Sequence, residues 1–187
     1  MRPRSIAWLA SFVLAACGGY GSALPSAKAP LSVREQRVFD DGVDLLANPE
    51  VLQDQWKADW DRDLHDRIEA SDLIVLGAVS NLRTDVDPGG TKTFSLAFGI
   101  ERVLQGSAPG GELNLQSRNG AQGYASIGEH AEELLQRRMV AFVKYALSED
   151  GTTVAHFHLV LPSKSIETSI SDHAAKMHPV IVIERNN

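Results

Sequence analysis

Residues 93–104 read TFSLAFGIERVL, and their pattern decides the fold class of the chain. The large apolar side chains of Phe94, Leu96, Phe98 and Ile100 alternate with small or polar residues. A period of two places alternate side chains on opposite faces of a strand. The stretch therefore predicts a β-strand with one face against a core.

Further strands are predicted on both sides of this one. The aliphatic run 71–84 precedes it across a turn rich in Asp, Pro and Gly, so the two segments predict a long hairpin. We expect a short helix near 129–137, and a loop with one helical turn over 163–177. The other segments with strand character are ELNLQS (112–117), MVAFVKYALS (139–148), TVAHFHLVLP (153–162) and PVIVIER (179–185).

Helices are predicted mainly before the strands. Residues 32–47 mix apolar and polar positions at loose helical spacing, and Asn48-Pro49-Glu50 combines a capping residue with a favoured first helical residue. Behind them an apolar stripe at intervals of four predicts an amphipathic helix over 50–70. The stripe consists of Leu52, Trp56, Trp60, Leu64 and Ile68.

Together these elements predict an α+β fold. We expect an N-terminal helix packed on a mainly antiparallel sheet of five to six strands, which forms a small closed or half-closed barrel that hides its edges. Trp56 and Trp60 are expected to pack the helix onto the sheet. The alternative is that the two indoles form a partner-binding surface.

The N-terminus has the features of a secretory signal. Arg2 and Arg4 precede an uncharged apolar run over 6–16, which is shorter than the roughly 20 residues of a membrane-spanning helix. The four residues Leu14-Ala15-Ala16-Cys17 resemble the bacterial lipobox. That resemblance implies that Cys17 is lipidated and becomes the first residue of the mature chain.

The lipobox defines the expected domain organisation. A signal peptide over 1–16 is followed by the lipidated Cys17 and a flexible tether over 17–31. A helical segment over 32–70 and a β-rich domain over 71–187 complete the chain. Gly18 occupies the position where Asp usually retains lipoproteins in the inner membrane, so the resemblance implies a lipid anchor in the bacterial cell envelope, at the outer membrane.

Composition excludes several function classes. The 187 residues carry a formal net charge of −6, which becomes more negative once Arg2 and Arg4 are removed, and this disfavours nucleic acid as a partner. Cys17 is the only cysteine, so the folded part contains no thiol for cysteine catalysis or cysteine-ligated zinc. No serine-hydrolase elbow, zincin helix or dinucleotide-binding glycine motif is present.

Residues 71–147 are similar in cadence to bacterial OB-like domains of the netrin/TIMP-like kind. The similarity rests on TFSLAFGIERVLQG, with its V-L-x-G turn, and on the later FV of RMVAFVKY. It implies an OB-like barrel, but the inhibitory cysteine-rich N-terminus is missing, so metalloprotease inhibition is not implied. The mature chain also resembles uncharacterised bacterial envelope lipoproteins, which brings no activity with it.

His156 and His158 are the best candidates for metal binding. On a strand their side chains share one face, and two imidazoles at this spacing can chelate Zn²⁺ or Cu²⁺. A third ligand would come from Asp172, His173 or His178. The favoured alternative is that the two histidines lie on the outer face of the strand while Phe157 and its alternating neighbours fill the core.

The sequence favours a lipid-anchored envelope protein with a non-catalytic binding or structural role. We expect no cofactor, and the partners would be the membrane and an envelope protein. One alternative is a metal-binding protein or metal-dependent hydrolase that uses His156 and His158. The other is an inhibitor or accessory subunit that docks through Trp56 and Trp60.

Overall fold

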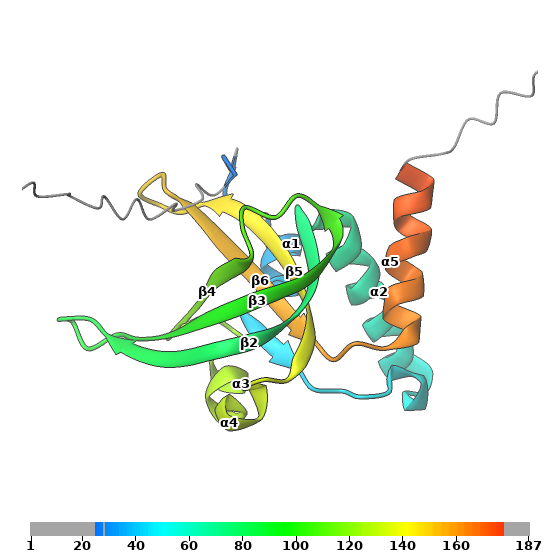
Figure 1. The fold of residues 1–187 in the computed structure, drawn as a ribbon, viewed down its shortest axis with the longest axis horizontal. Coiled ribbons are helices and arrows are strands. Elements are labelled where there is room, and N and C mark those ends of the chain that lie inside the picture. Colours follow the sequence, from blue (N-terminus) through cyan, green and yellow to red (C-terminus); the bar gives the residue numbers. More distant parts are fainter. Residues whose placement is uncertain (1–24, 28, 178–187) are drawn as a thin grey trace, which may run out of the picture.

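The computed structural model describes residues 25–27 and 29–177 and shows a mixed α+β fold. Its six strands form one strongly curled sheet, a half-barrel, in the order β1-β6-β5-β2-β3-β4 (Figure 1). Neighbouring strands are antiparallel except for β1, which runs parallel to β6. The strands are β1 (Gly42–Asp44), β2 (Leu73–Val86), β3 (Lys92–Gly106), β4 (Glu112–Arg118), β5 (Arg138–Leu147) and β6 (Thr153–Val160).

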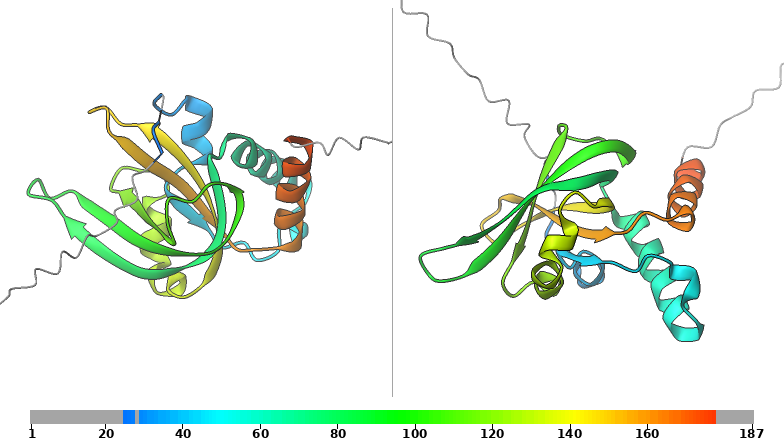
Figure 2. Two further views of the ribbon diagram at one scale, coloured as in Figure 1. Left: turned by 45° about the horizontal axis from the view of Figure 1, so that its top comes forward. Right: turned by 60° about the horizontal axis from the view of Figure 1, so that its bottom comes forward.

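The helices lie around this sheet. The longest two, α2 and α5, lie side by side outside it, whereas the short α3 and α4 lie on another side of the half-barrel (Figure 2). Within the described residues, no helix combines the length and the apolar character that crossing a membrane requires. The helices are α1 (Val33–Val38), the 3-10 helix η1 (Pro49–Val51), α2 (Asp54–Ala70), α3 (Tyr124–Glu129), α4 (Ala131–Leu134) and α5 (Lys164–Met177).

The long hairpin expected from the sequence is present, and a second hairpin joins β5 to β6. β2 pairs with β3 along nearly its whole length, with three register shifts, and β5 pairs with β6. At the second shift Gly77 lies so close to the carbonyl oxygen of Gly99 that a Cβ would collide with it. Gly77 thus permits the bend that curls the sheet.

The concave face of the sheet holds the larger core. Alternate side chains of every strand point into it, and Ile127 of α3 and Leu134 of α4 pack against them. Tyr145, near the end of β5, is its only buried tyrosine within the described residues. Fully buried strand members include Leu73, Val75, Leu96, Phe98, Met139 and Phe157.

A second apolar cluster, called the outer cluster below, lies on the convex face. It joins side chains of β2, β5 and β6 to side chains of α1, α2 and α5. Because β5 and the first half of β2 (73–79) are buried on both faces, these segments are almost continuously apolar in sequence. The cluster contains Val38, Phe39, Leu64, Ile68, Ile74, Leu76, Val140, Phe142, Val160, Ile166 and Ile170.

Two expectations about helices are wrong. Residues 32–47 form a helix only as far as Val38, where the chain turns and adds β1 beside β6. Residues 163–177 contain the fourteen-residue α5 instead of a loop, because Ile166 and Ile170 bury one side of this segment in the outer cluster. Both elements are stabilised by tertiary contacts more than by local propensity.

Other boundaries differ in detail. Asn48 caps η1 through its side chain, whereas α2 begins five residues after η1 does, at Asp54. The short helix expected near 129–137 is present as α4, and a further short helix, α3, precedes it. The predicted signal peptide, Cys17 and the predicted strand 179–185 lie outside the described residues.

Candidate functional site

His156 and His158 lie on the convex face of β6, with Phe157 in the concave core between them. The expected division of this strand into two faces is therefore confirmed. The convex face is not open to solvent here, because the loop between α1 and β1 covers it. His158 Nδ1 lies 2.7 Å from Asp40 Oδ1, and His156 Nδ1 lies 3.0 Å from Asp41 Oδ2.

Backbone contacts hold the same loop against β6. The Asp41 amide donates to the carbonyl oxygen of Phe157, at 2.9 Å, and the Phe157 amide donates to Asp41 Oδ1, at 3.0 Å. Asp41 adopts a positive φ of 56°, which costs energy for a residue with a side chain. The two Asp–His pairs, together with these bonds, fix the loop in a strained turn beside the strand.

Burial dominates the electrostatics of the Asp40–His158 pair. His158 is only 5% exposed, and burial, together with the positive charge of Arg67, lowers its pKa despite the opposing effect of Asp40. Burial alone would raise the pKa of Asp40, but its hydrogen bond to His158, together with the positive charge of Arg67, outweighs this and lowers it. A neutral imidazole that donates Nδ1–H to an ionised Asp40 accounts for both shifts.

Arg67 of α2 completes the buried polar layer. Its Nε donates to the carbonyl oxygen of Val38 at 3.0 Å, at the end of α1, and burial lowers its pKa. Next to it, Asp66 binds Arg34 and Arg37 of α1. These contacts tie α1 to α2.

An Asp–His pair can serve as a base in catalysis when the second imidazole nitrogen faces a nucleophile. In this protein His158 Nε2 is buried and has no hydrogen-bond partner among the described residues. A substrate therefore has no access to the nitrogen that would do the chemistry. The geometry suits a structural contact.

The other proposed metal ligands lie elsewhere. Asp172 and His173 line a groove between α2 and α5, together with Asp61 and His65, and His178 lies outside the described residues. Over residues 25–27 and 29–177, no three His, Cys, Asp or Glu side chains are grouped closely enough to hold a metal ion.

The two tryptophans of α2 have different environments. Trp60 packs against the outer cluster, and its Nε1 is buried without a hydrogen-bond partner in the described part of the chain. Trp56, one turn earlier, is 77% exposed. Only the second half of the predicted apolar stripe is buried, so Trp56 is available for a contact that Trp60 cannot make.

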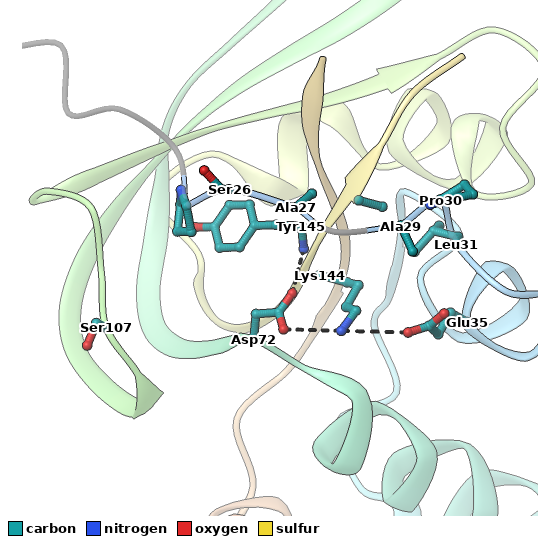
Figure 3. Close-up of a pocket in the computed structure, with 12 residues that line it drawn as sticks. Ser26, Ala27, Ala29, Pro30, Leu31, Glu35, Asp72, Ser107, Lys144 and Tyr145 are labelled. Carbon is teal, nitrogen blue, oxygen red and sulfur yellow. Dashed lines mark hydrogen bonds and ion pairs between the residues drawn. The ribbon is translucent and has the colours of Figure 1, made fainter. Parts of the chain in front are cut away.

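A cavity of about 470 Å³ opens beside the end of β5 (Figure 3). Residues 25–27 and 29–31 run along one side of it, where the Ala27 amide donates to Thr153 Oγ1 and the Leu147 amide donates to the carbonyl oxygen of Ala29. On another side the Lys144 ammonium lies 3.1 Å from Asp72 Oδ1 and 3.6 Å from Glu35 Oε1. Lys144 neutralises only one of the two carboxylates, so this side of the cavity keeps a net negative charge.

Tyr145 gives this cavity a polar group without a protein partner. The side chain is 5% exposed, and its hydroxyl is buried with no hydrogen-bond partner among the described residues. Burial, and the nearby charge of Asp72, raise the pKa of Tyr145, so the hydroxyl keeps its proton at neutral pH. It can both donate and accept a hydrogen bond within the cavity wall.

Comparison with known proteins adds no family to this description. The chain matches no protein-family model, and no curated protein matches it.

Proposed function

We propose that this protein is a lipid-anchored binding protein of the bacterial cell envelope. The lipobox at Cys17 supports the anchor and the outer-membrane location, and the acidic composition disfavours nucleic acid. The curled six-stranded sheet supports an OB-like barrel, and the burial of Leu64 and Ile68 supports α2 as a helix packed on it.

The observation that carries the binding role is the cavity at Tyr145. Ligand sites combine apolar walls with a few polar groups that lack partners until a ligand arrives. This cavity has apolar walls from Ala27, Pro30, Leu31 and Ala146, and it includes Tyr145, whose unpaired hydroxyl is buried in the wall and would meet a ligand only once the wall opens. His156 and His158, the best candidates for catalysis or metal binding, each pair with an Asp of the loop between α1 and β1. Because both pairs hold this loop, we favour binding over catalysis.

The predicted anchor would hold the cavity close to the membrane. Only eight residue steps separate Cys17 from Pro25, which lines the cavity. Such a segment spans at most about 29 Å when extended. The ligand would therefore be taken up near the lipid surface.

Two variants test the proposal. Cys17→Ser should move the protein from the membrane fraction to the soluble fraction, and retention of an otherwise normal variant in membranes would contradict the anchor.

Tyr145→Phe removes only the unpaired hydroxyl. Compounds that co-purify with the wild type should be lost from Tyr145→Phe and kept by Tyr124→Phe, a matched change on α3. Identical compounds in all three proteins, measured by mass spectrometry, would contradict the cavity as the binding site.

A second candidate function is that of an accessory subunit in an envelope complex. The exposure of Trp56 favours it, because large exposed indoles are common anchors of protein interfaces. If it is correct, Trp56→Ala should abolish co-purification of an envelope protein that Val51→Ala retains. Val51 is also exposed and lies just before the same helix. Equal retention by both variants would reject this candidate.

A further inference from the structure

A strap of chain forms one wall of the cavity at Tyr145. The strap consists of residues 25–27 and 29–31, which line the cavity together with Tyr145. In Figure 3 the ring of Tyr145 points toward the strap near Ser26. The described residues of the strap form no helix or strand. The wall that faces this ring is therefore an irregular segment and not part of the sheet.

The strap lies beside a part of β5 that β2 does not reach. β2 begins at Leu73, which pairs with Val143, so residues 144–147 at the end of β5 extend past it. There the Leu147 amide donates to the carbonyl oxygen of Ala29, at 2.9 Å. The strap thus supplies one backbone bond at an edge where a paired strand would add a regular ladder.

Few contacts hold the strap in place. Within the described residues, the only other hydrogen bond between strap and sheet joins the Ala27 amide to Thr153 Oγ1, at 3.3 Å. Ala27 also packs against the concave core and Leu31 is partly buried, whereas the rest of the described strap is exposed. Segments with so few buried contacts open at a lower free energy than the core strands, so the strap can detach while the sheet stays folded.

Three polar groups lie under or beside the strap. The strap itself satisfies two of them, the Leu147 amide and Thr153 Oγ1. It leaves the third, the buried hydroxyl of Tyr145, without a partner among the described residues. Detachment of the strap frees all three groups, and the hydroxyl can then both donate to and accept from a ligand.

We propose that the strap is a lid that regulates the cavity. While the lid is closed, the Tyr145 hydroxyl is sealed in the wall and no ligand enters or leaves. When the lid detaches from Leu147 and Thr153, the hydroxyl meets the ligand. The inference rests on the proposed function for the role of the cavity, but opening of the lid requires no ligand and can be measured by itself.

Amide hydrogen exchange at Leu147 tests the opening, because the strap protects this amide. In a full-length Cys17→Ser background, Thr153→Val removes the acceptor of the Ala27 amide and should speed exchange at Leu147 at least tenfold. Thr153→Ser keeps a hydroxyl and is the matched control, and exchange at Val143 should stay unchanged in both. Unchanged exchange at Leu147 in Thr153→Val would overturn the proposal. Equal acceleration at Val143 would also overturn it, because the sheet and not the lid would then open.

A covalent lock tests the connection between the lid and Tyr145. In the same background, Ala27→Cys with Thr153→Cys should form a disulfide under mild oxidation. Tetranitromethane, which nitrates accessible tyrosine rings, should then modify Tyr145 at least tenfold more slowly than in the parent protein without cysteines. Tyr124 on α3 is the internal control and should react at the same rate in both. Failure of the disulfide to form, or equal nitration of Tyr145, would overturn the proposal.

The locked protein also separates the lid from the proposed function. Compounds that co-purify with the parent protein should dissociate during dialysis, but should stay bound when the lock is closed before dialysis. Equal loss from both, measured by mass spectrometry, would show that the lid does not control the cavity. If the parent carries no compounds, the proposed function fails, while exchange at Leu147 and nitration of Tyr145 still decide whether the lid exists.

Discussion

The two faces of the curled sheet are buried by different means. The concave face packs strand side chains against one another, and all its large members are apolar apart from the tyrosine hydroxyl. The convex face also buries apolar side chains, but it includes Asp40, His158, Arg67 and Asp66 in the contact between helices, loop and strand. One face is a simple core, and the other combines a core with a polar layer.

The two faces therefore contribute differently: the concave core mainly stabilises the fold, and the polar layer of the convex face mainly fixes the positions of the elements around it. Apolar burial is non-directional, so the concave core stabilises the sheet without fixing one precise arrangement of loops. Buried polar and charged groups cost desolvation energy, which is repaid only when their partners are well placed. The polar layer on the convex face therefore defines where α1, the loop at Asp40 and α2 lie.

Phe157→Ala should cause the largest loss of stability. Phe157 is fully buried in the concave core, and truncation of a buried Phe removes apolar burial and leaves a cavity. We expect unfolding free energy to fall by about 3–5 kcal/mol, measured by urea denaturation. Val86→Ala, at an exposed site, is the control and should change it by less than about 0.5 kcal/mol. A loss below about 1 kcal/mol for Phe157→Ala would contradict the assignment of the main core to this face.

Asp40→Ala should have the next largest effect. It leaves the buried Nδ1–H of His158 without an acceptor and releases one of the contacts that hold the loop to β6. We expect a loss of about 2–3 kcal/mol. Asp40→Asn keeps an acceptor oxygen and should cost less. If the two variants are equally destabilised, the hydrogen bond is not what stabilises the loop.

A smaller effect should appear as a pH dependence of stability. The pKa of His158 in the folded protein lies below its usual value of 6.5, so the unfolded chain takes up a proton that the folded protein does not. The stability is then complete above about pH 6.5 and falls as the pH drops below it. Asp40, with its pKa lowered from 3.8, adds a further loss at more acidic pH.

Chemical denaturation at pH 7.5 and pH 5 measures this effect. We expect the wild type to lose on the order of 1 kcal/mol between the two values. His158→Gln keeps a side-chain donor for Asp40 but does not titrate, so most of the loss should disappear. A variant with the same pH dependence as the wild type would show that another group is responsible.

The sequence predicts the concave face well because its signal is local. Alternation from Phe94 to Ile100 identifies β3, and the turn residues before it identify the hairpin with β2. Each of these patterns involves neighbours within a few residues. The strands β2 to β6 and the mainly antiparallel sheet follow from such patterns, whereas β1 does not.

The convex face could not be predicted in the same way. β1 is three residues long, and it exists because it pairs with β6, which is more than a hundred residues away in sequence. The shared face of His156 and His158 was predictable, but their carboxylate partners lie 115 and 118 residues away. In sequence Tyr145 resembles any other residue of an apolar strand, since no local signal reveals a buried hydroxyl that lacks a partner.

Trp56→Ala should have the smallest effect on stability. The side chain is 77% exposed, and alanine has a higher helix propensity than tryptophan, so we expect a change within about 0.5 kcal/mol. Trp60→Ala, one turn later, should cost about 1–3 kcal/mol because Trp60 packs against the outer cluster. Urea denaturation of the two variants compares the exposed and buried halves of one helix. Equal losses would mean that the indole of Trp56 is covered in solution, and the surface available for an envelope partner would then have to lie elsewhere.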